Sequence, residues 1–387
     1  MDESGNPHHL SLSLLFLVQL PPPIHGVTVM SERVLREAAS MSGINVRHLW
    51  TGGARELTDI GRKRFRKFTD FALFLLKLCA MQFSSKRYDI AYCALAPHGE
   101  ALLRDALLIG AAKRTAGRVL VHLHTQGLHE VLDGCTFLQR VSRYLISGTE
   151  LISLSEGTRV AAEASGRFKR VHMLGNSVPD PGEQVTQPSG RLRCGFLGNL
   201  DSRKGVLRFV DAIAALKQAG VPAQGTIVGT TSKYLRVEDV RAHAREKGIS
   251  DLIETSGFVD EETKSKILGS LDLFIYLSDH DLAPLVLLES LAHSTVPIVF
   301  DTGAMREIVG PEFQENVISE KHDCDSYLAA IVSVARKYYE APELLEAKKR
   351  AARRRYLELF SEEAFRSNLS RIIRPDLRLP SKSSPSM

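Results

Sequence analysis

The chain has 387 residues, of which 44% are hydrophobic and 25% charged, as in an ordinary soluble globular protein. A chain of this length is too long to fold around one small hydrophobic core, so we expect two domains. The net charge of +5 is mild, and no basic stripe is interleaved with aromatic residues, so a nucleic-acid partner is not expected. Five dispersed cysteines without a CxxC pair favour neither a zinc site nor disulfides, and reduced thiols in the cytoplasm are expected.

In the first half, short apolar runs alternate with helical patterns, which is typical of parallel sheets covered on both faces. The run Leu10–Leu20 lacks a basic flank and a cleavage site and is too short to span a bilayer, so it predicts a buried strand rather than a signal peptide. The predicted strands are Leu12–Leu20, Val46–Leu49, Ile90–Ala94, Val119–His124, Leu151–Leu154 and Arg170–Leu174. The predicted helices are Val29–Ser40 and Ala101–Thr115, and residues around Leu128–Arg143 are expected to be loops on the acceptor side.

A basic cluster, Arg62–Lys67, precedes the apolar helix predicted over Phe68–Phe83. Cations beside exposed apolar residues suit peripheral contact with an anionic membrane, which would place the chain at the inner face of that membrane. The alternative, which the pattern slightly favours, is a solvated helix start followed by a helix packed into the core.

The turn-rich residues 179–190 predict a linker between an N-terminal domain (1–178) and a C-terminal domain (191–360). A helix over 361–374 is predicted next, with a return to the first domain as one option, and the polar tail 375–387 is expected to be disordered. Two doubly wound α/β domains facing a central cleft are the simplest architecture, with ligands at the carboxyl ends of the strands. The strands predicted in the second half are Leu192–Leu197, Gln224–Val228, Ile253–Thr255, Leu273–Leu277 and Ile298–Phe300, and the helices are Val206–Gln218, Val237–Lys247, Glu261–Ser270 and Leu285–His293.

A glycine turn follows the first strand of the second half and leads into a helix. Gly198 and Asn199 open this turn, and Arg203 and Lys204 close it. Glycine lets the backbone approach a diphosphate, and a cation near the helix start adds to the positive helix dipole, so Lys204 is the predicted phosphate partner. A plain turn with two solvated charges is the alternative, because the spacing is neither a Walker loop nor G-x-G-x-x-G.

Two carboxylates, Asp281 and Glu289, lie eight positions apart on a loop and on the helix that follows it. One can accept hydrogen bonds from sugar hydroxyls and the other from the paired ribose hydroxyls, while the free N–H groups of the helix start face phosphate. A capping aspartate and a solvated glutamate are the alternative. The strings Asp279-x-Asp281 and Asp323-x-Asp325 are not interpreted as metal sites, and no metal is expected.

Two positions in the first half lie where strands are predicted to end. Gly26, after the first strand, would let backbone N–H groups reach an anion, although a plain strand–helix turn is equally compatible. His122 and His124 share one face of a later strand by alternation, and His124 lies nearer the loop, where it can donate a hydrogen bond to a ligand hydroxyl. A structural histidine is the alternative.

Taken in order, these segments resemble the retaining glycosyltransferases of family 4, which have the two-domain GT-B fold, over nearly the whole chain. The matching landmarks are Pro-Pro-x-His25-Gly26, His124, Ser153-Leu-Ser155-Glu, Gly175-Asn176-Ser-Val178, Gly198 with Lys204-Gly205, Val228-Gly229, Gly257-Phe258-Val259, Asp281-x7-Glu289, Pro297-Ile-Val, Gly303-Ala304 and Glu307-Ile-Val.

The resemblance implies that Lys204 holds the diphosphate, Glu289 the donor ribose and Asp281 the donor-sugar hydroxyls. It places His124 beside the transferred sugar and Gly26 on a loop facing the diphosphate. Further donor contacts are implied for the base-flanking Phe258 and Val259 and for the backbone N–H groups of Ala283, Pro284, Leu285 and Val286, which would support the phosphate and the sugar.

The chain departs from the family pattern at several of these positions. Asp281 replaces the usual glutamate, Leu282-Ala283 a Gly-aromatic pair, Asn199 a common phosphate-binding arginine and Ser294 a common glycine. Arg203 could compensate for Asn199 by approaching the same phosphate.

The resemblance therefore implies a metal-independent enzyme that transfers a sugar, with retention, from a UDP- or GDP-linked donor to a glycan or polyprenyl-linked acceptor in polysaccharide or surface-glycan synthesis. No cofactor is expected beyond this nucleotide sugar. A GT-B nucleotide-sugar epimerase and a catalytically silent binding subunit remain alternatives.

Overall fold

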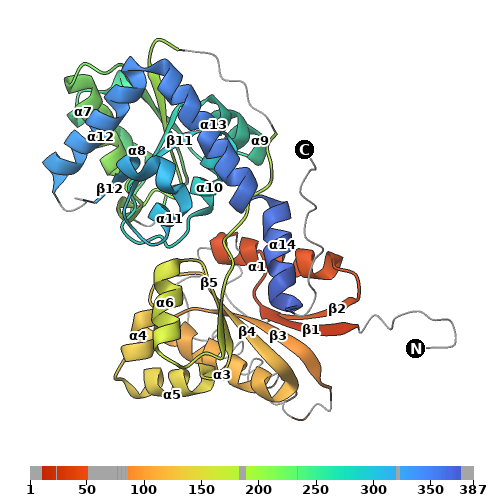
Figure 1. Cartoon of the computed structure of the whole chain (residues 1–387). Coiled ribbons are helices and arrows are strands. Elements are labelled where there is room, and N and C mark those ends of the chain that lie inside the picture. The colour runs from red at the N-terminus through yellow and green to blue at the C-terminus, as the bar shows by residue number, and fades with distance from the viewer. Residues whose placement is uncertain are drawn as a thin grey trace, which may run out of the picture. The chain divides into compact units, whose positions relative to one another are not determined.

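The computed structural model describes residues 11–22, 24–50, 76, 80, 83, 86–182, 189–232, 234–319 and 323–375. The chain divides into two compact units (Figure 1). Unit 1 comprises Met1–Ser153, Thr158–Leu174 and Glu363–Met387, and unit 2 comprises Leu154–Gly157 and Gly175–Glu362. The predicted basic cluster, all but three residues of the helix after it, and residues 376–387 lie outside the described residues.

Unit 1 contains a parallel six-stranded sheet with the order β2-β1-β3-β4-β5-β6. β1 lies between β2 and β3, and its residues Leu14–Val18 are all at most 2% exposed, so both of its faces are covered. This burial explains the continuous apolar run of the sequence. The strands are β1 (Leu12–Val18), β2 (Ile44–Trp50), β3 (Tyr88–Leu95), β4 (Ala116–Leu123), β5 (Glu150–Ser153) and β6 (Arg170–Met173).

The described helices of the first half are α1 (Gly26–Ser40), α3 (Gly99–Thr115), α4 (Leu128–Asp133), α5 (Phe137–Ile146) and α6 (Glu156–Ala164). The loops expected around Leu128–Arg143 were therefore a wrong prediction. α5 begins with a capping box in which the Thr136 hydroxyl accepts a hydrogen bond from the N–H of Gln139 and the Gln139 side-chain oxygen accepts one from the N–H of Thr136. This reciprocal bonding satisfies two helix-start donors and stabilises the helix.

The last described helix, α14 (Glu362–Ile373), packs within unit 1 although it follows unit 2 in the chain. Its carboxyl end is held by Arg118 of β4, whose guanidinium donates to the carbonyls of Ile372 and Ile373. The same guanidinium forms a two-pronged ion pair with Glu150, and His172 contacts Glu150 at 2.7 Å. This buried charge cluster joins α14 to the amino edge of the sheet.

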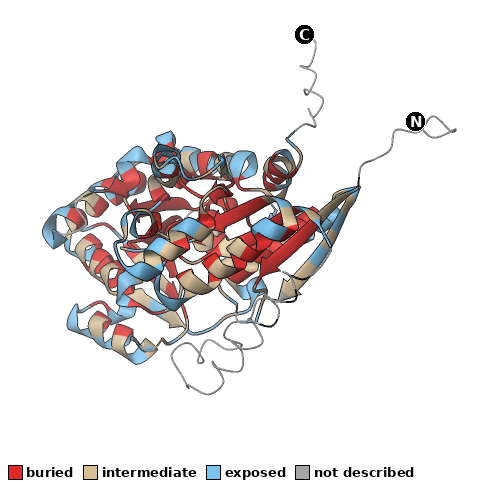
Figure 2. Cartoon of the chain, turned by 90° about the horizontal axis from the view of Figure 1, so that it is seen from below, coloured by how far each residue is buried: buried red, intermediate tan, exposed pale blue. Residues whose placement is uncertain are grey.

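Unit 2 contains a second parallel six-stranded sheet, in the order β12-β11-β10-β7-β8-β9. Its strands are β7 (Leu192–Leu197), β8 (Ala223–Val228), β9 (Ile253–Ser256), β10 (Leu273–Tyr276), β11 (Val296–Phe300) and β12 (Val317–Ile318). Its helices are α7 (Val206–Gln218), α8 (Val237–Glu246), α9 (Glu261–Ser270), α10 (Leu285–Ala292), α11 (Met305–Val309), α12 (Cys324–Glu340) and α13 (Pro342–Leu359). Figure 2 shows buried strands beneath helices whose outer faces are exposed. Among the described residues, no helix combines the length and apolarity needed to cross a membrane.

Candidate functional site

The turn after β7 brings Lys204 to the end of β10. A short 3-10 turn, Ser202–Lys204, ends at Gly205, which adopts a left-handed conformation (φ +86°) and begins α7. A Cβ atom on Gly205 would lie 2.4 Å from the carbonyl oxygen of Leu277, so only glycine permits this approach. β7 and β10 are neighbours in the sheet, and Lys204 therefore lies beside the loop that follows β10.

Lys204 forms an ion pair with Asp281 in this loop. Its Nζ lies 3.0 Å from Oδ1 and 3.1 Å from Oδ2 of Asp281. The Oδ2 atom also accepts hydrogen bonds from the hydroxyls of Tyr276 (2.8 Å) and Ser278 (2.7 Å). Burial raises the pKa of Asp281, but the Lys204 ammonium and the two hydroxyls outweigh burial and lower this pKa below its ordinary value. Asp281 is therefore ionised at neutral pH.

The same loop is fixed by further backbone and side-chain contacts. Arg208 of α7 donates to the carbonyl of Leu277 (3.0 Å) and to the carboxylate of Asp279 (2.6 Å). Gly303, at φ +58°, lies so close that a Cβ atom would be 2.5 Å from the carbonyl oxygen of Asp281. The Asp279-x-Asp281 string is thus engaged with cations of the protein, and the described residues include no cluster of metal-ligating side chains.

Glu289 lies on α10, the helix that follows the loop. Its Oε1 is 2.9 Å from Nζ of Lys264, a residue of α9 that sequence reasoning did not identify. The start of α10 offers the backbone N–H groups of Leu285 and Val286, which no earlier turn of the helix can satisfy. Pro284 has no N–H, so it cannot donate a hydrogen bond as the predicted set required.

Other predicted donor-binding residues are not joined to the Lys204–Asp281 pair by direct contacts. Arg203 pairs with Asp201 (2.6 Å), and its guanidinium lies 5.1 Å from the centre of the Tyr234 ring. Asn199 accepts a hydrogen bond from Thr230 (3.0 Å). Phe258 is 83% exposed.

Of two more predicted donor-binding residues, Val259 packs against the core of unit 2, whereas Gly198 lies beside Lys204, since a Cβ atom on Gly198 would be 3.8 Å from Cδ of Lys204. Val259 is partly buried. Gly198 donates its N–H to the carbonyl of Val228, and a Cβ on Gly229 would lie 2.0 Å from the Gly198 carbonyl oxygen. Gly198 thus brings the turns after β7 and β8 into contact.

In unit 1, the predicted His124 belongs to a buried aromatic group. Its ring centre lies 3.9 Å from that of His122, which confirms that both point to one face of β4. His122 Nδ1 lies 2.6 Å from the hydroxyl of Tyr92. Burial and the neighbouring His25 lower the pKa of His124 to about 4, so its ring is neutral at pH 7. Its Nε2 is buried without a hydrogen-bond partner among the described residues.

His25 and the predicted Gly26 begin α1. His25 caps the helix, since its Nδ1 accepts a hydrogen bond from the N–H of Thr28 and its own N–H donates to the Thr28 hydroxyl. Gly26 is the first residue of the helix, and a Cβ atom there would meet no atom within 4 Å. Burial lowers the pKa of His25. Glycine is therefore not required at residue 26 by contacts within unit 1.

Tyr276, Ser278 and Lys264 were missed by sequence reasoning. Tyr276 was part of a predicted apolar strand, and a buried tyrosine hydroxyl requires a polar partner, which was the one available signal. Lys264 lies 25 positions before its partner Glu289, and only the packing of α9 against α10 brings them together.

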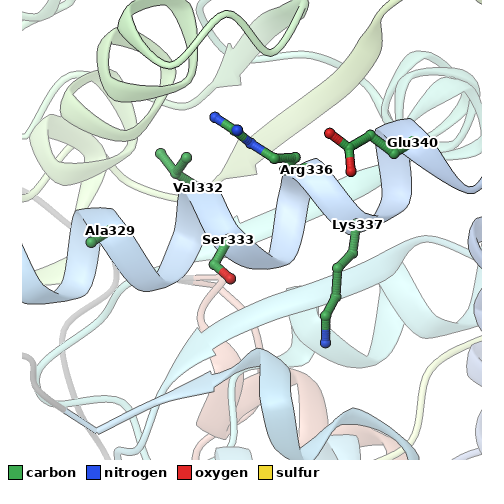
Figure 3. Close-up of a pocket in the computed structure, with 6 residues that line it drawn as sticks. All are labelled: Ala329, Val332, Ser333, Arg336, Lys337 and Glu340. Atoms are coloured by element: carbon green, nitrogen blue, oxygen red, sulfur yellow. The ribbon is translucent and has the colours of Figure 1, made fainter.

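A hollow of about 440 Å³ runs along α12 in unit 2 (Figure 3). It is lined by Ala329, Val332, Ser333, Arg336, Lys337 and Glu340. Its two cations are already engaged, Arg336 with the carbonyl of Ala219 and Lys337 with Glu315. No predicted site residue lines this hollow, so the candidate site rests on the contacts of Lys204 and Glu289.

A family similarity is found within unit 2. Residues 183–355 match the family described as glycosyl transferases group 1. The matched residues lie within unit 2 and make up less than half of the chain. A GDP-mannose-dependent alpha-(1-6)-phosphatidylinositol dimannoside mannosyltransferase of Mycobacterium tuberculosis is 31% identical to this chain over 166 residues. The match covers 42% of this chain and 39% of the mannosyltransferase, so it spans less than half of either protein.

Solved structures extend the similarity to both units. Sucrose-phosphate synthase from Thermosynechococcus elongatus has a TM-score of 0.72 at 15% identity and covers 94% of this chain and 98% of its own. The lipopolysaccharide galactosyltransferase WaaB has a TM-score of 0.68 at 13% identity, covering 95% and 100%. Anabaena HepE, in complex with UDP and glucose, has a TM-score of 0.64 at 16% identity, covering 94% and 100%. These similarities confirm the predicted GT-B fold.

Proposed function

We propose that the chain is a retaining glycosyltransferase that moves a sugar from a nucleotide diphosphate sugar to a glycan or lipid-linked acceptor. The observation that carries the proposal is the Lys204–Asp281 pair at the carboxyl edge of the unit 2 sheet, within the residues that match the group 1 family. An ammonium group already held beside the start of a helix suits a diphosphate leaving group.

The charges of the site support a division of roles. Negative charge grows on the diphosphate as the glycosidic bond loosens, and Lys204 with the N–H groups of Leu285 and Val286 would stabilise it. When phosphate takes over Lys204, the Asp281 carboxylate would exchange its Lys204 contact for a hydrogen bond from the sugar. Glu289 would accept hydrogen bonds from the ribose. No metal or other cofactor is part of this proposal.

The nature of donor and acceptor is proposed from the relatives. The mannosyltransferase is named for GDP-mannose and for a phosphatidylinositol dimannoside acceptor, and HepE was solved with UDP. A GDP- or UDP-linked donor and a lipid-linked acceptor are therefore the first to test. Such an acceptor would bring the enzyme to the cytoplasmic face of a membrane during surface-glycan synthesis.

The test is a turnover assay of UDP- and GDP-sugars with and without a panel of lipid-linked and glycan acceptors, with the anomeric configuration of the product read by NMR. Lys204→Ala and Glu289→Gln should each slow transfer by about 100-fold or more. Lys217→Ala is the matched control, because Lys217 lies at the far end of α7 and its Nζ donates a hydrogen bond to the carbonyl of Gly248.

Wild-type rates in both site variants would refute the site assignment. An altered nucleotide sugar formed without acceptor would identify an epimerase. Binding of the nucleotide sugar without turnover over the whole panel would identify a silent binding subunit.

A further inference from the structure

The helix α9 holds Glu289 at two points. Lys264 contacts the Glu289 carboxylate, with Nζ 2.9 Å from Oε1. The next residue, Ser265, lies 2.8 Å from Nε2 of His293, and the Nδ1 atom of His293 lies 2.7 Å from the backbone carbonyl of Glu289. One helix therefore fixes both the side chain and the main chain of this glutamate.

The protonation state of His293 determines which of its ring nitrogens donates a hydrogen bond to the Glu289 carbonyl. Burial lowers the pKa of His293, so its ring is neutral at pH 7. A carbonyl oxygen only accepts hydrogen bonds, so the single ring proton must lie on Nδ1 and point to Glu289. Nε2 then accepts the Ser265 hydroxyl proton. This chain of bonds fixes the position of the Glu289 main chain relative to α9.

Lys264 is a fixed cation at this point. Burial lowers the pKa of Lys264, but the carboxylates of Glu289 and Glu261 outweigh burial and raise this pKa above the ordinary lysine value. Its side chain and that of Glu289 are 23% and 21% exposed, so both remain partly open to solvent. Glu261, the second partner at 2.7 Å, is 88% exposed.

The Lys264 contact leaves acceptor capacity on Glu289. An ionised carboxylate has two oxygens with about four lone-pair positions, and the Lys264 contact occupies one of them, on Oε1. Two neighbouring ribose hydroxyls need two acceptors in a defined orientation. A glutamate side chain without the Lys264 bond could rotate away from that orientation.

We propose that Lys264 is a positioning residue that orients the Glu289 carboxylate toward both ribose hydroxyls and thereby sets a preference for ribonucleotides over 2′-deoxyribonucleotides. The inference rests on the proposed function, in which Glu289 binds the donor ribose. It assigns the discrimination between ribose and deoxyribose to α9, a helix that contains none of the charged residues predicted to touch the donor.

The experiment is calorimetric titration of the full chain with UDP, GDP and their 2′-deoxy counterparts. A hydrogen bond to a charged acceptor contributes about 1.5–3 kcal/mol, so the wild type should prefer the ribose form of its nucleotide by about tenfold or more. In Lys264→Met this ratio should fall to about twofold, with the affinity for the 2′-deoxy form largely kept. Lys264→Arg should restore part of the preference.

The control is Lys266→Met, the same change two residues along α9, where Lys266 is 74% exposed and pairs with Glu262. It should keep the wild-type ratio, and thermal melting should show that all variants are folded. A wild-type ratio in folded Lys264→Met would overturn the inference while leaving nucleotide binding intact. Equal affinities of the wild type for ribose and deoxyribose forms would overturn both the Glu289 contact and the role of Lys264. No binding of either nucleotide by the wild type would instead overturn the proposed function.

Discussion

The carboxyl edges of the two sheets carry different ionisable groups although both units have the same doubly wound plan. In unit 2 the ion pairs at this edge include Lys204–Asp281 and Lys264–Glu289. In unit 1 the ends of β1 and β4 carry His25 and His124, whose pKa values are lowered by burial, so that both rings are neutral at pH 7, and the end of β3 lies beside the Arg104–Asp105 ion pair.

This difference shows that the shared plan of the sheets does not determine what each edge binds. Paired charges can be exchanged for the charges of a ligand, since each ion is partly desolvated and held in place. Neutral imidazoles bond to hydroxyl groups and contribute no net charge. We infer that unit 2 suits the charged nucleotide and unit 1 the hydroxyl groups of sugars.

The largest effect in unit 1 is expected from His124→Ala, which removes the imidazole whose buried Nε2 has no hydrogen-bond partner among the described residues. Turnover should fall by about 100-fold while nucleotide affinity stays within about twofold. Because the pKa of His124 is lowered to about 4, the neutral ring is present from pH 8 down to about 5 and is lost only as the pH falls through 4. The measurement is the pH dependence of kcat and of kcat/KM, with the exposed His129→Ala as the control. An inflection near pH 6.5 that disappears in His124→Ala would contradict the neutral character of this edge.

A second prediction concerns Glu150, a buried carboxylate at the amino edge of the unit 1 sheet, and asks whether this charge stabilises the fold. The hydrogen bonds of Arg118 and His172 outweigh burial and lower the pKa of Glu150 from 4.5 to about 2. A lowered carboxyl pKa adds stability that is complete above pH 4.5 and is lost as the pH falls toward 2, with an upper value of about 3 kcal/mol. Glu150→Gln should therefore unfold at lower urea concentration at pH 7, and the difference from the wild type should shrink at pH 3.

Nucleotide affinity should be unchanged in folded Glu150→Gln. The control is Glu163→Gln, because the Glu163–Arg159 pair is an exposed contact within one helix, which contributes at most about 0.5 kcal/mol. If the two substitutions lowered the free energy of unfolding equally, the buried Arg118–Glu150 pair would stabilise the protein no more than an exposed pair does.

The smallest effect concerns the end of α10, the helix that carries Glu289. Ser294, which follows this helix, has φ +60°, a left-handed conformation that costs most residues about 1–2 kcal/mol and suits glycine. Ser294→Gly should raise the free energy of unfolding by about 1 kcal/mol and keep nucleotide affinity. Ser290→Gly, inside the same helix, should lower the free energy of unfolding by a similar amount. A lower melting temperature in Ser294→Gly would show that the left-handed conformation of Ser294 does not destabilise the protein.

Much of the fold followed from the sequence, because its hydrophobic periods are regular. The ranges Leu192–Leu197, Val206–Gln218 and Glu261–Ser270 were correct to the residue. The strand β12 was missed because two residues show no period. The helix α5 was missed although its capping pair, Thr136 and Gln139, is visible in the sequence.

The site was predicted less completely, since ion pairs across the fold leave no local pattern. Lys204 and Asp281 were both found, but as partners of a ligand rather than of each other, because they lie 77 positions apart. Arg203 was predicted beside the phosphate, and the structure pairs it with Asp201, which lies two residues earlier. Local spacing identified candidate residues, and only tertiary packing showed which of them share a contact.

The central claim is that Lys204 exchanges Asp281 for the diphosphate of the donor, and calorimetric titration with UDP and GDP tests it most directly. Lys204→Ala should weaken binding of the preferred nucleoside diphosphate by about tenfold or more, because a phosphate contact is lost. Asp281→Asn should strengthen it several-fold, because the competing negative charge is removed. Unchanged affinity in both variants, or a shift in the same direction, would contradict the account.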